Sequence, residues 1–203
     1  MDSVIQIIEK PDWVSWDEIH DVVWQAHAQN REKGIVMRYP SLQGEEIRQR
    51  IEGKGKMFVA LDDTKLVGTA AYSIKKAPLW CGKGYYGYYC FASLLPSHRK
   101  MGIYPRLCEI REKELVKQGI HRIMMDTHES NKRELSLARK QGFIPVDLVA
   151  RKDHYSVLMV KWLDGCPYSS FRCSLNYHLR RLMVKIRSFR HIHKSNAPVN
   201  LNN

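Results

Sequence analysis

Apolar residues recur along the chain with two spacings, an alternation typical of strands and a spacing of three to four residues typical of helices. Short apolar runs bounded by proline, glycine or polar residues predict strands at 4–9, 57–61, 65–74, 88–95, 120–127, 143–150 and 155–163. The helical spacing predicts helices at 15–34, 45–52, 102–118 and 131–142. The resulting order is β-α-α-β-β-β-α-β-α-β-β, so we expect a mixed α/β fold.

Local signals set the ends of several of these elements. Ser15 followed by Glu18 is a capping box, which predicts that a helix begins there. Pro105 falls in the first turn of the 102–118 helix, where its missing N–H costs nothing. The stretch 77–87 holds one proline and three glycines, and it therefore predicts a loop before the next strand.

Length and composition indicate one globular domain with an extension. The chain has 203 residues, of which 44% are hydrophobic and 27% charged, close to the averages for globular proteins. We expect a domain over 1–165 and an extension over 166–203. The N-terminus lacks a signal-peptide pattern and no apolar run is long enough to cross a bilayer, so we expect a cytoplasmic protein. The five cysteines are widely spaced and form no C-x-x-C, which predicts reduced thiols and no metal site.

The extension is an electrostatic unit of its own. The formal net charge is +12, and 166–203 holds seven basic residues and no acidic one: Arg172, Arg180, Arg181, Lys185, Arg187, Arg190 and Lys194. Apolar residues at helical spacing between Phe171 and Phe189 predict an amphipathic basic helix. Such a helix packs on its own domain or on a second copy of the chain in a homodimer, or contacts an anionic membrane surface. Nucleic acid ranks below these partners because no recognised binding module accompanies the charge.

The segment from Leu94 to Leu107 carries the most informative chemistry. A predicted strand passes through a short basic loop directly into a helix, and the first N–H groups of a helix have no intrahelical partner. Arg99 and Lys100 add charge, and Gly102 lets the backbone approach a ligand closely. The loop therefore predicts an anion cradle, with a simple solvated connection as the alternative.

A second helix about thirty residues later completes a recognisable pair. The first segment contains Pro96, Arg99 and Gly102, and the second contains Asn131, Gly142 and Phe143. Together they resemble the GNAT superfamily of N-acetyltransferases, whose signature couples P-x-x-R-x-x-G-x-G/A to N-x-x-A-x-x-x-Y-x-x-x-G-F. The resemblance covers about 4–163 and implies a mixed, mainly antiparallel twisted sheet flanked by helices.

The resemblance also implies acetyl-CoA as co-substrate and a set of residues that bind it. That set is Ser93, Leu94, Leu95, Arg99, Lys100, Met101, Gly102, Ile103, Tyr104 and Asn131. Asn131 also suits the cap of its helix. An amine would attack the thioester directly, while a backbone N–H of the strand ending at Leu95 polarises the carbonyl.

The attacking amine must lose a proton to a base near the ends of the two central strands. Asp126, His128 and Glu129 lie at the end of the second strand. We expect Glu129 and His128 to be the catalytic pair, with ordinary surface positions as the alternative. His98 is expected to be a solvated loop residue.

The sequence departs from the family signature at three positions. Tyr104 stands where the family usually has glycine or alanine, and Lys100 where it often has glycine, which predicts a narrower and more basic cradle. Ala138 stands where many members carry the tyrosine that protonates the departing thiolate. A thiol with a pKa near ~8.5 leaves acceptably without that help. These departures keep a non-catalytic acyl-CoA-binding protein among the alternatives.

The acceptor is expected to be the primary amine of a small molecule, with an amino sugar in surface-glycan synthesis as the leading candidate. The loop with Trp80, Cys81 and Gly82 would form its wall, because loops on a rigid scaffold often supply specificity. The aromatic residues from Tyr85 to Phe91 suit the core better than an acceptor pocket. The alternatives are a protein lysine or N-terminus as acceptor, and a basic membrane or nucleic-acid adaptor.

Overall fold

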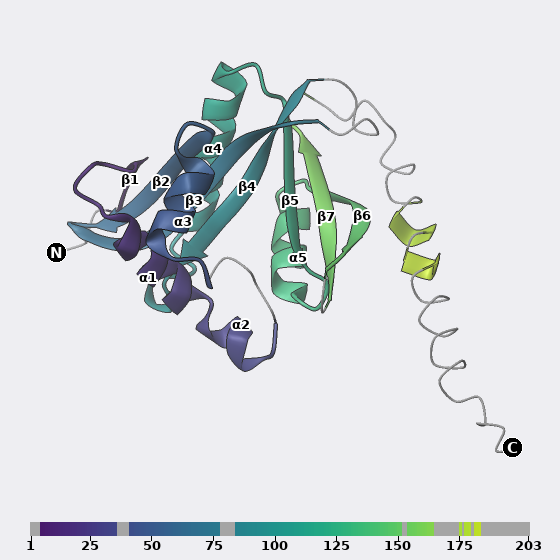
Figure 1. Cartoon of the computed structure of the whole chain (residues 1–203), viewed down its shortest axis with the longest axis horizontal. Coiled ribbons are helices and arrows are strands. Elements are labelled where there is room, and N and C mark those ends of the chain that lie inside the picture. Colours follow the sequence, from purple (N-terminus) through teal and green to yellow (C-terminus); the bar gives the residue numbers. More distant parts are fainter. Residues whose placement is uncertain are drawn as a thin grey trace, which may run out of the picture.

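The fold is built on one seven-stranded sheet with the spatial order β1-β2-β3-β4-β5-β7-β6 (Figure 1). The computed structural model describes residues 5–35, 41–77, 84–151, 154–164, 175, 177–179 and 181–183. The strands are β1 (Ile5–Glu9), β2 (Gly55–Asp62), β3 (Lys65–Lys76), β4 (Tyr85–Leu94), β5 (Arg122–His128), β6 (Ile144–Ala150) and β7 (Tyr155–Trp162). All neighbouring strands are antiparallel except β4 and β5, so the mainly antiparallel sheet expected from the sequence is confirmed.

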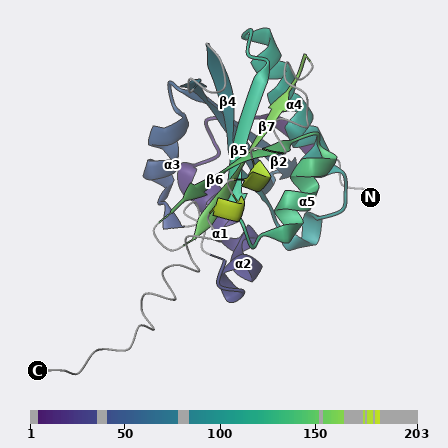
Figure 2. The same cartoon turned by 90° about the vertical axis from the view of Figure 1, so that its right-hand side faces the viewer.

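Helices cover both faces of the sheet. They are α1 (Trp16–Ala26), α2 (Ala28–Glu32), α3 (Gly44–Ile51), α4 (Ile103–Lys117) and α5 (Lys132–Lys140), and the short 3₁₀ helix η3 (Pro96–His98) precedes α4. In Figure 2, α3 lies on one side of the sheet and α4 and α5 lie on the other. Helix α1 packs against α3. Two separate apolar clusters match this arrangement, one under α1 and α3 and one under α4 and α5.

The helix predicted over 15–34 is in fact two helices. His27 ends α1 and begins α2, with φ −100° and ψ 9°, outside helical geometry. No glycine or proline marks this break, so the apolar spacing alone predicted one continuous helix. The strand predicted at 88–95 begins three residues earlier, at Tyr85, because the aromatic residues before it continue the pairing with β3.

The central strands β4 and β5 pair only at their beginnings. Gly87 lies opposite Ile123 and Tyr88 opposite Met124, and no pairing follows beyond these positions. In β4 a bulge sets Phe91 and Ala92 together against Ala70 of β3, with Phe91 at φ +52°. A bulge bends its strand and increases the local twist. The end of β4 therefore diverges from β5 and opens a gap in the sheet.

Gly87 fixes the point from which the two strands diverge. A Cβ at this position would lie 2.7 Å from Leu115 Cδ2 of α4, and Leu115 is fully buried. Only glycine lets α4 approach the sheet this closely where β4 and β5 are still paired.

The aromatic residues of β4 serve both the core and the surface. Tyr89 and Phe91 are buried, as expected, whereas Tyr85 is 60% exposed. Cys90 and Cys108 are free and buried. The loop with Trp80, Cys81 and Gly82 lies outside the described residues.

Seven residues of the extension are described, and all of them are helical: Leu175, Tyr177, His178, Leu179, Arg181, Leu182 and Met183. Tyr177 is only 5% exposed and belongs to the apolar cluster under α4 and α5. Leu179 and Leu182 are about half exposed, at 51% and 54%. The rest of the predicted basic helix and the predicted boundary between 165 and 166 lie outside the described ranges. None of the described helices is both long and apolar enough to span a bilayer.

Candidate functional site

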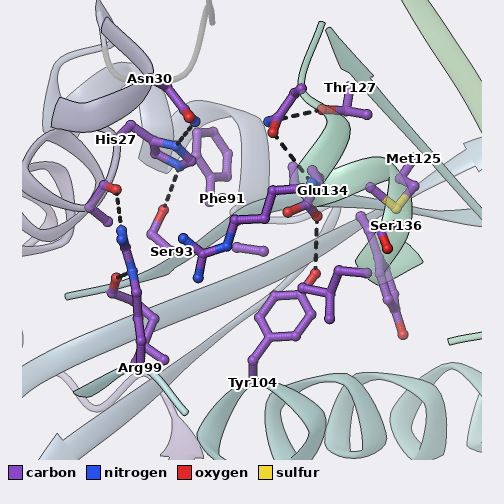
Figure 3. A pocket seen from close by; sticks show the side chains of 18 of the residues that line it. His27, Asn30, Phe91, Ser93, Arg99, Tyr104, Met125, Thr127, Glu134 and Ser136 are labelled. Carbon is purple, nitrogen blue, oxygen red and sulfur yellow. Dashed lines mark hydrogen bonds between the residues drawn. The ribbon is translucent and has the colours of Figure 1, made fainter. Parts of the chain in front are cut away.

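A cavity of about 530 Å³ occupies the gap between the diverging ends of β4 and β5 (Figure 3). The α1–α2 junction closes it on one side, and the first turns of α4 and α5 close it on the other. Its polar and charged lining comes mainly from His27, Gln29, Asn30, Ser93, Arg99, Lys100, Tyr104, Arg111, Asp126, Thr127, Asn131, Arg133, Glu134, Ser136 and Lys140.

The loop before α4 borders the cavity at Lys100 and Tyr104 and forms a wall there with unpaired backbone donors. Lys100 and Gly102 both adopt positive φ, at +69° and +73°, and Gly102 is the N-cap of α4. Across the described part of the chain, the amides from Lys100 to Tyr104 have no protein acceptor. A Cβ at Gly102 would touch nothing, so the positive φ, and not lack of space, favours glycine. This wall suits an anionic group.

Arg99 lines the cavity but uses its guanidinium to hold the opposite wall in place. Its Nη2 donates to the Ala26 carbonyl at 2.7 Å, and its Nη1 donates to Gln29 Oε1 at 3.2 Å. Lys100, Arg133 and Lys140 are the other basic side chains near the mouth, against the carboxylates of Asp126 and Glu134. The balance of charge therefore favours an anionic ligand.

A polar chain runs from the α1–α2 junction to β4. Asn30 Nδ2 lies 3.2 Å from His27 Nδ1, and His27 Nε2 lies 3.2 Å from Ser93 Oγ (Figure 3). Burial lowers the pKa of His27 to about 4, with the charges of Arg99 and Arg31 acting in the same direction. His27 is therefore neutral near pH 7. The sequence carried no signal for it, because its partner in β4 is 66 positions away.

Tyr104 and Glu134 meet between α4 and α5. The Tyr104 hydroxyl donates to Glu134 Oε1 at 3.2 Å, and both residues line the cavity. Burial raises the pKa of Glu134 and that of the Tyr104 hydroxyl. Glu134 stands where the family signature has alanine, so the sequence carries a signal for this position.

Asn131 caps α5 and lines the cavity. It is the N-cap of α5, its Oδ1 accepts from the Glu134 amide at 3.3 Å, and its Nδ2 donates to Thr127 Oγ1. The capping role is confirmed. Its contact with a bound ligand stays a prediction, consistent with its position in the cavity lining. Ala138, by contrast, is buried in the core.

Arg111 forms part of the floor and is fully buried. It donates to the carbonyls of Leu107 and Ala71 and to Cys108 Sγ, and its guanidinium stacks 3.7 Å from the ring centroid of Tyr89. No carboxylate among the described residues forms an ion pair with it. Arg111 is therefore a buried positive charge close to the bulge in β4.

The structure places Asp126, not the expected pair, in the cavity. Asp126 accepts a hydrogen bond from the Tyr88 hydroxyl. It also forms an ion pair with Arg151, whose Nη2 lies 2.9 Å from Asp126 Oδ2. His128 and Glu129 are absent from the lining. His128 stacks on His154 at 4.4 Å between ring centroids, and its Nδ1 accepts from the Ser130 amide.

The other predicted residues divide into two groups. Ser93 and Leu94 line the cavity, whereas Leu95, Met101, Gly102 and Ile103 do not. The Leu95 N–H donates to the Val67 carbonyl at 2.9 Å, which leaves it no proton for a thioester carbonyl.

His98 is not the solvated residue that the sequence suggested. Its Nε2 lies 3.0 Å from Asp62 Oδ2 at the end of β2, with only 14% of its side chain exposed. It therefore ties the loop before α4 to the sheet. No group of three or more metal-ligating side chains occurs among the described residues.

Comparison with known proteins gives one family and one fold. The family model for the acetyltransferase (GNAT) family matches residues 13–143. No curated protein matches the chain in sequence.

Many solved structures share the fold. An acetyltransferase from Streptococcus agalactiae is 20% identical, with a TM-score of 0.59 over 78% of this chain and 98% of that one. The ribosomal-protein-S18-alanine N-acetyltransferase of Escherichia coli is 13% identical, with a TM-score of 0.60 over 82% and 98%. The PaiA N-acetyltransferase of Thermoplasma acidophilum, in complex with coenzyme A, is 19% identical, with a TM-score of 0.59 over 78% and 99%.

Proposed function

The chain belongs to the GNAT acetyltransferase family, and on that basis we propose that it transfers the acetyl group of acetyl-CoA to a primary amine of a small molecule. Members of this family use acetyl-CoA as co-substrate. The observation that carries the proposal is the row of unpaired amides from Lys100 to Tyr104 beside a cavity with a basic rim.

The residues at the mouth fit the diphosphate of coenzyme A. Backbone N–H groups at a helix N-terminus donate well to phosphate oxygens, and the helix dipole adds to the attraction. Lys100, Arg133 and Lys140 supply full charges nearby. The thioester end would then lie between β4 and β5, beside the polar groups that these strands contribute to the lining.

Asp126 is the residue that we propose as the proton acceptor. The amine nitrogen attacks the thioester carbonyl carbon, the C–S bond breaks with its electrons on sulfur, and the amine proton passes to Asp126. The Tyr88 hydroxyl and Arg151 hold the two carboxylate oxygens of Asp126, which fixes its orientation. Glu129 and His128 would need a water relay to reach the cavity.

A small amine is favoured because the cavity of about 530 Å³ lies between α1, α2, β4, α4, β5 and α5 and leaves limited room for an acceptor beside acetyl-CoA. An amino sugar as acceptor, the cytoplasmic location and a membrane or dimer contact of the extension stay predictions. A protein N-terminus is the second candidate, since one neighbour in fold is an N-acetyltransferase of ribosomal-protein-S18 alanine. A non-catalytic acyl-CoA-binding role is the third, because Ala138 lacks the hydroxyl that many members carry.

Two measurements test the proposal. Coenzyme A binding by calorimetry should weaken about tenfold or more, equal to ~1.4 kcal/mol, in a Lys100→Glu, Gly102→Trp variant. Lys117→Glu, at the exposed far end of the same helix, is the control and should bind as the parent does. An unchanged affinity in the loop variant would refute the binding site.

Thiol release from acetyl-CoA over a panel of amino sugars, polyamines, amino acids and an alanine-ended peptide tests the chemistry. Release with a small amine supports the proposal. Release with the peptide alone supports the second candidate. Binding without release on any amine supports the non-catalytic role.

A further inference from the structure

In the chain of hydrogen bonds from Asn30 through His27 to Ser93, each proton is donated toward Ser93. The amide nitrogen of Asn30 carries hydrogens and no available lone pair, so it donates to His27 Nδ1. A neutral imidazole whose Nδ1 accepts must carry its single proton on Nε2. Nε2 therefore donates to Ser93 Oγ, and the Ser93 hydroxyl is left with a proton to give.

The proton of Ser93 has no protein acceptor. Ser93 is only 4% exposed, and within the described residues its Oγ has the His27 ring as its one hydrogen-bond partner. A buried donor without an acceptor costs free energy, roughly 1–3 kcal/mol, unless a ligand supplies the acceptor. Ser93 lines the cavity directly after the bulge in β4, where the strand leaves β5. The unpaired proton is therefore available to a ligand in the cavity.

We propose that Ser93 is a catalytic hydrogen-bond donor to the carbonyl oxygen of the thioester in this cavity, and that His27 is a positioning residue that fixes the direction of the Ser93 hydroxyl. The inference deepens the proposed function and rests on it. During attack by the amine, the carbonyl oxygen gains negative charge, and a donor already oriented toward it stabilises that charge without reorganisation. Ser93 forms no covalent bond, and its proton stays on Oγ.

The same geometry argues against Ser93 as a nucleophile. A nucleophilic serine needs a base that accepts its proton. In His27 the nitrogen that faces Ser93 already carries a proton, and the other nitrogen accepts from Asn30. Arg99 and Arg31 face the imidazole and oppose a second proton on it. His27 can orient Ser93 but cannot deprotonate it.

The direct test is the carbonyl stretch of bound acetyl-CoA labelled with ¹³C at the carbonyl, measured by difference infrared spectroscopy. This experiment needs no acceptor amine. The parent should show a shift to lower frequency relative to free acetyl-CoA. Ser93→Ala should lose most of that shift, and the spectra are recorded with the variant saturated with acetyl-CoA. Ser93→Thr, which keeps a hydroxyl, should retain the shift.

His27 is tested by two substitutions that differ in hydrogen-bond donation. His27→Gln keeps an N–H donor and should preserve the carbonyl shift, whereas His27→Leu should lose it as Ser93→Ala does. Ser73→Ala is the matched control, because Ser73 is a buried strand serine outside the cavity lining.

Turnover gives a second readout if the panel contains a substrate. Loss of one such donor costs ~100-fold or more in kcat in known enzymes, so Ser93→Ala should lower kcat by roughly 10- to 100-fold with the KM for acetyl-CoA nearly unchanged. A carbonyl frequency that is equal in the parent and in Ser93→Ala overturns this inference alone. Failure of the parent to bind acetyl-CoA overturns the proposed function as well. A covalent acetyl-Ser93 detected by mass spectrometry would show the nucleophilic role instead.

Discussion

The neutral state of His27 predicts how the fold responds to acid. In an unfolded chain a histidine has a pKa of about 6.5, whereas burial holds the pKa of His27 at about 4. Between these two values the unfolded chain binds a proton at His27 that the folded chain does not bind. The free energy of unfolding must therefore fall as the pH drops through this window.

The size of this effect follows from the two pKa values. At pH 7 both states are mostly deprotonated, so His27 contributes little to the pH dependence. At pH 5 the unfolded chain is almost fully protonated at this residue, and the native state loses about 2 kcal/mol relative to pH 7. This loss is a large fraction of the 5–15 kcal/mol typical of a domain.

Urea unfolding of the parent and of His27→Gln, each at pH 7 and pH 5, isolates this contribution. Glutamine keeps an N–H donor for Ser93 but does not titrate, and all other ionisable groups are common to both proteins. The parent should lose about 2 kcal/mol more than the variant between the two pH values. Equal losses would show that folding does not lower the pKa of His27, and the argument that burial keeps this imidazole neutral at pH 5 would then be wrong.

Four further substitutions test the packing of the fold and the charge of the site. Gly87→Ala should lower the free energy of unfolding in urea by about 1–3 kcal/mol, because the new methyl group overlaps Leu115. A free energy of unfolding equal to that of the parent would contradict the close approach of α4. Glu134→Gln removes a carboxylate from the cavity and should tighten coenzyme A binding a few-fold at low salt, by roughly 0.5–1 kcal/mol. Weaker binding would refute the argument that the charge of the lining favours an anionic ligand. In the extension, Tyr177→Ala should lower the free energy of unfolding by about 3 kcal/mol, because this side chain is buried. Leu179→Glu, at a half-exposed position, should change it by less than about 0.5 kcal/mol. Similar effects of the two substitutions would show that Tyr177 does not anchor the helix.

The sequence predicted the elements well because their signals are local. The capping box at Ser15 and the apolar spacing after it placed the start of α1 correctly. The end of α1 was missed because it depends on a tertiary contact. His27 leaves helical geometry where its side chain reaches Ser93, and nothing in the neighbouring residues encodes that contact.

The predicted pair His128 and Glu129 lies outside the cavity lining for a related reason. The sequence indicated only that the proton acceptor should lie near the ends of the two central strands. The cavity instead begins where β4 and β5 separate, directly after Met124. Beyond that point β5 stays paired with β7 as far as His128. Which residue of a strand faces the gap therefore depends on pairing between strands, which spacing along one strand does not reveal.

Two departures from the family signature compensate for each other in the structure. Tyr104 alone suggested a narrower cradle, because a large ring replaces glycine or alanine. Glu134, thirty residues later, replaces alanine and accepts the hydrogen bond of that ring's hydroxyl. The pair thus satisfies two polar groups that would each be costly if buried alone. Because the ring is held against α5 in this way, the bulkier residues still leave a cavity of about 530 Å³ beside the unpaired amides of the loop.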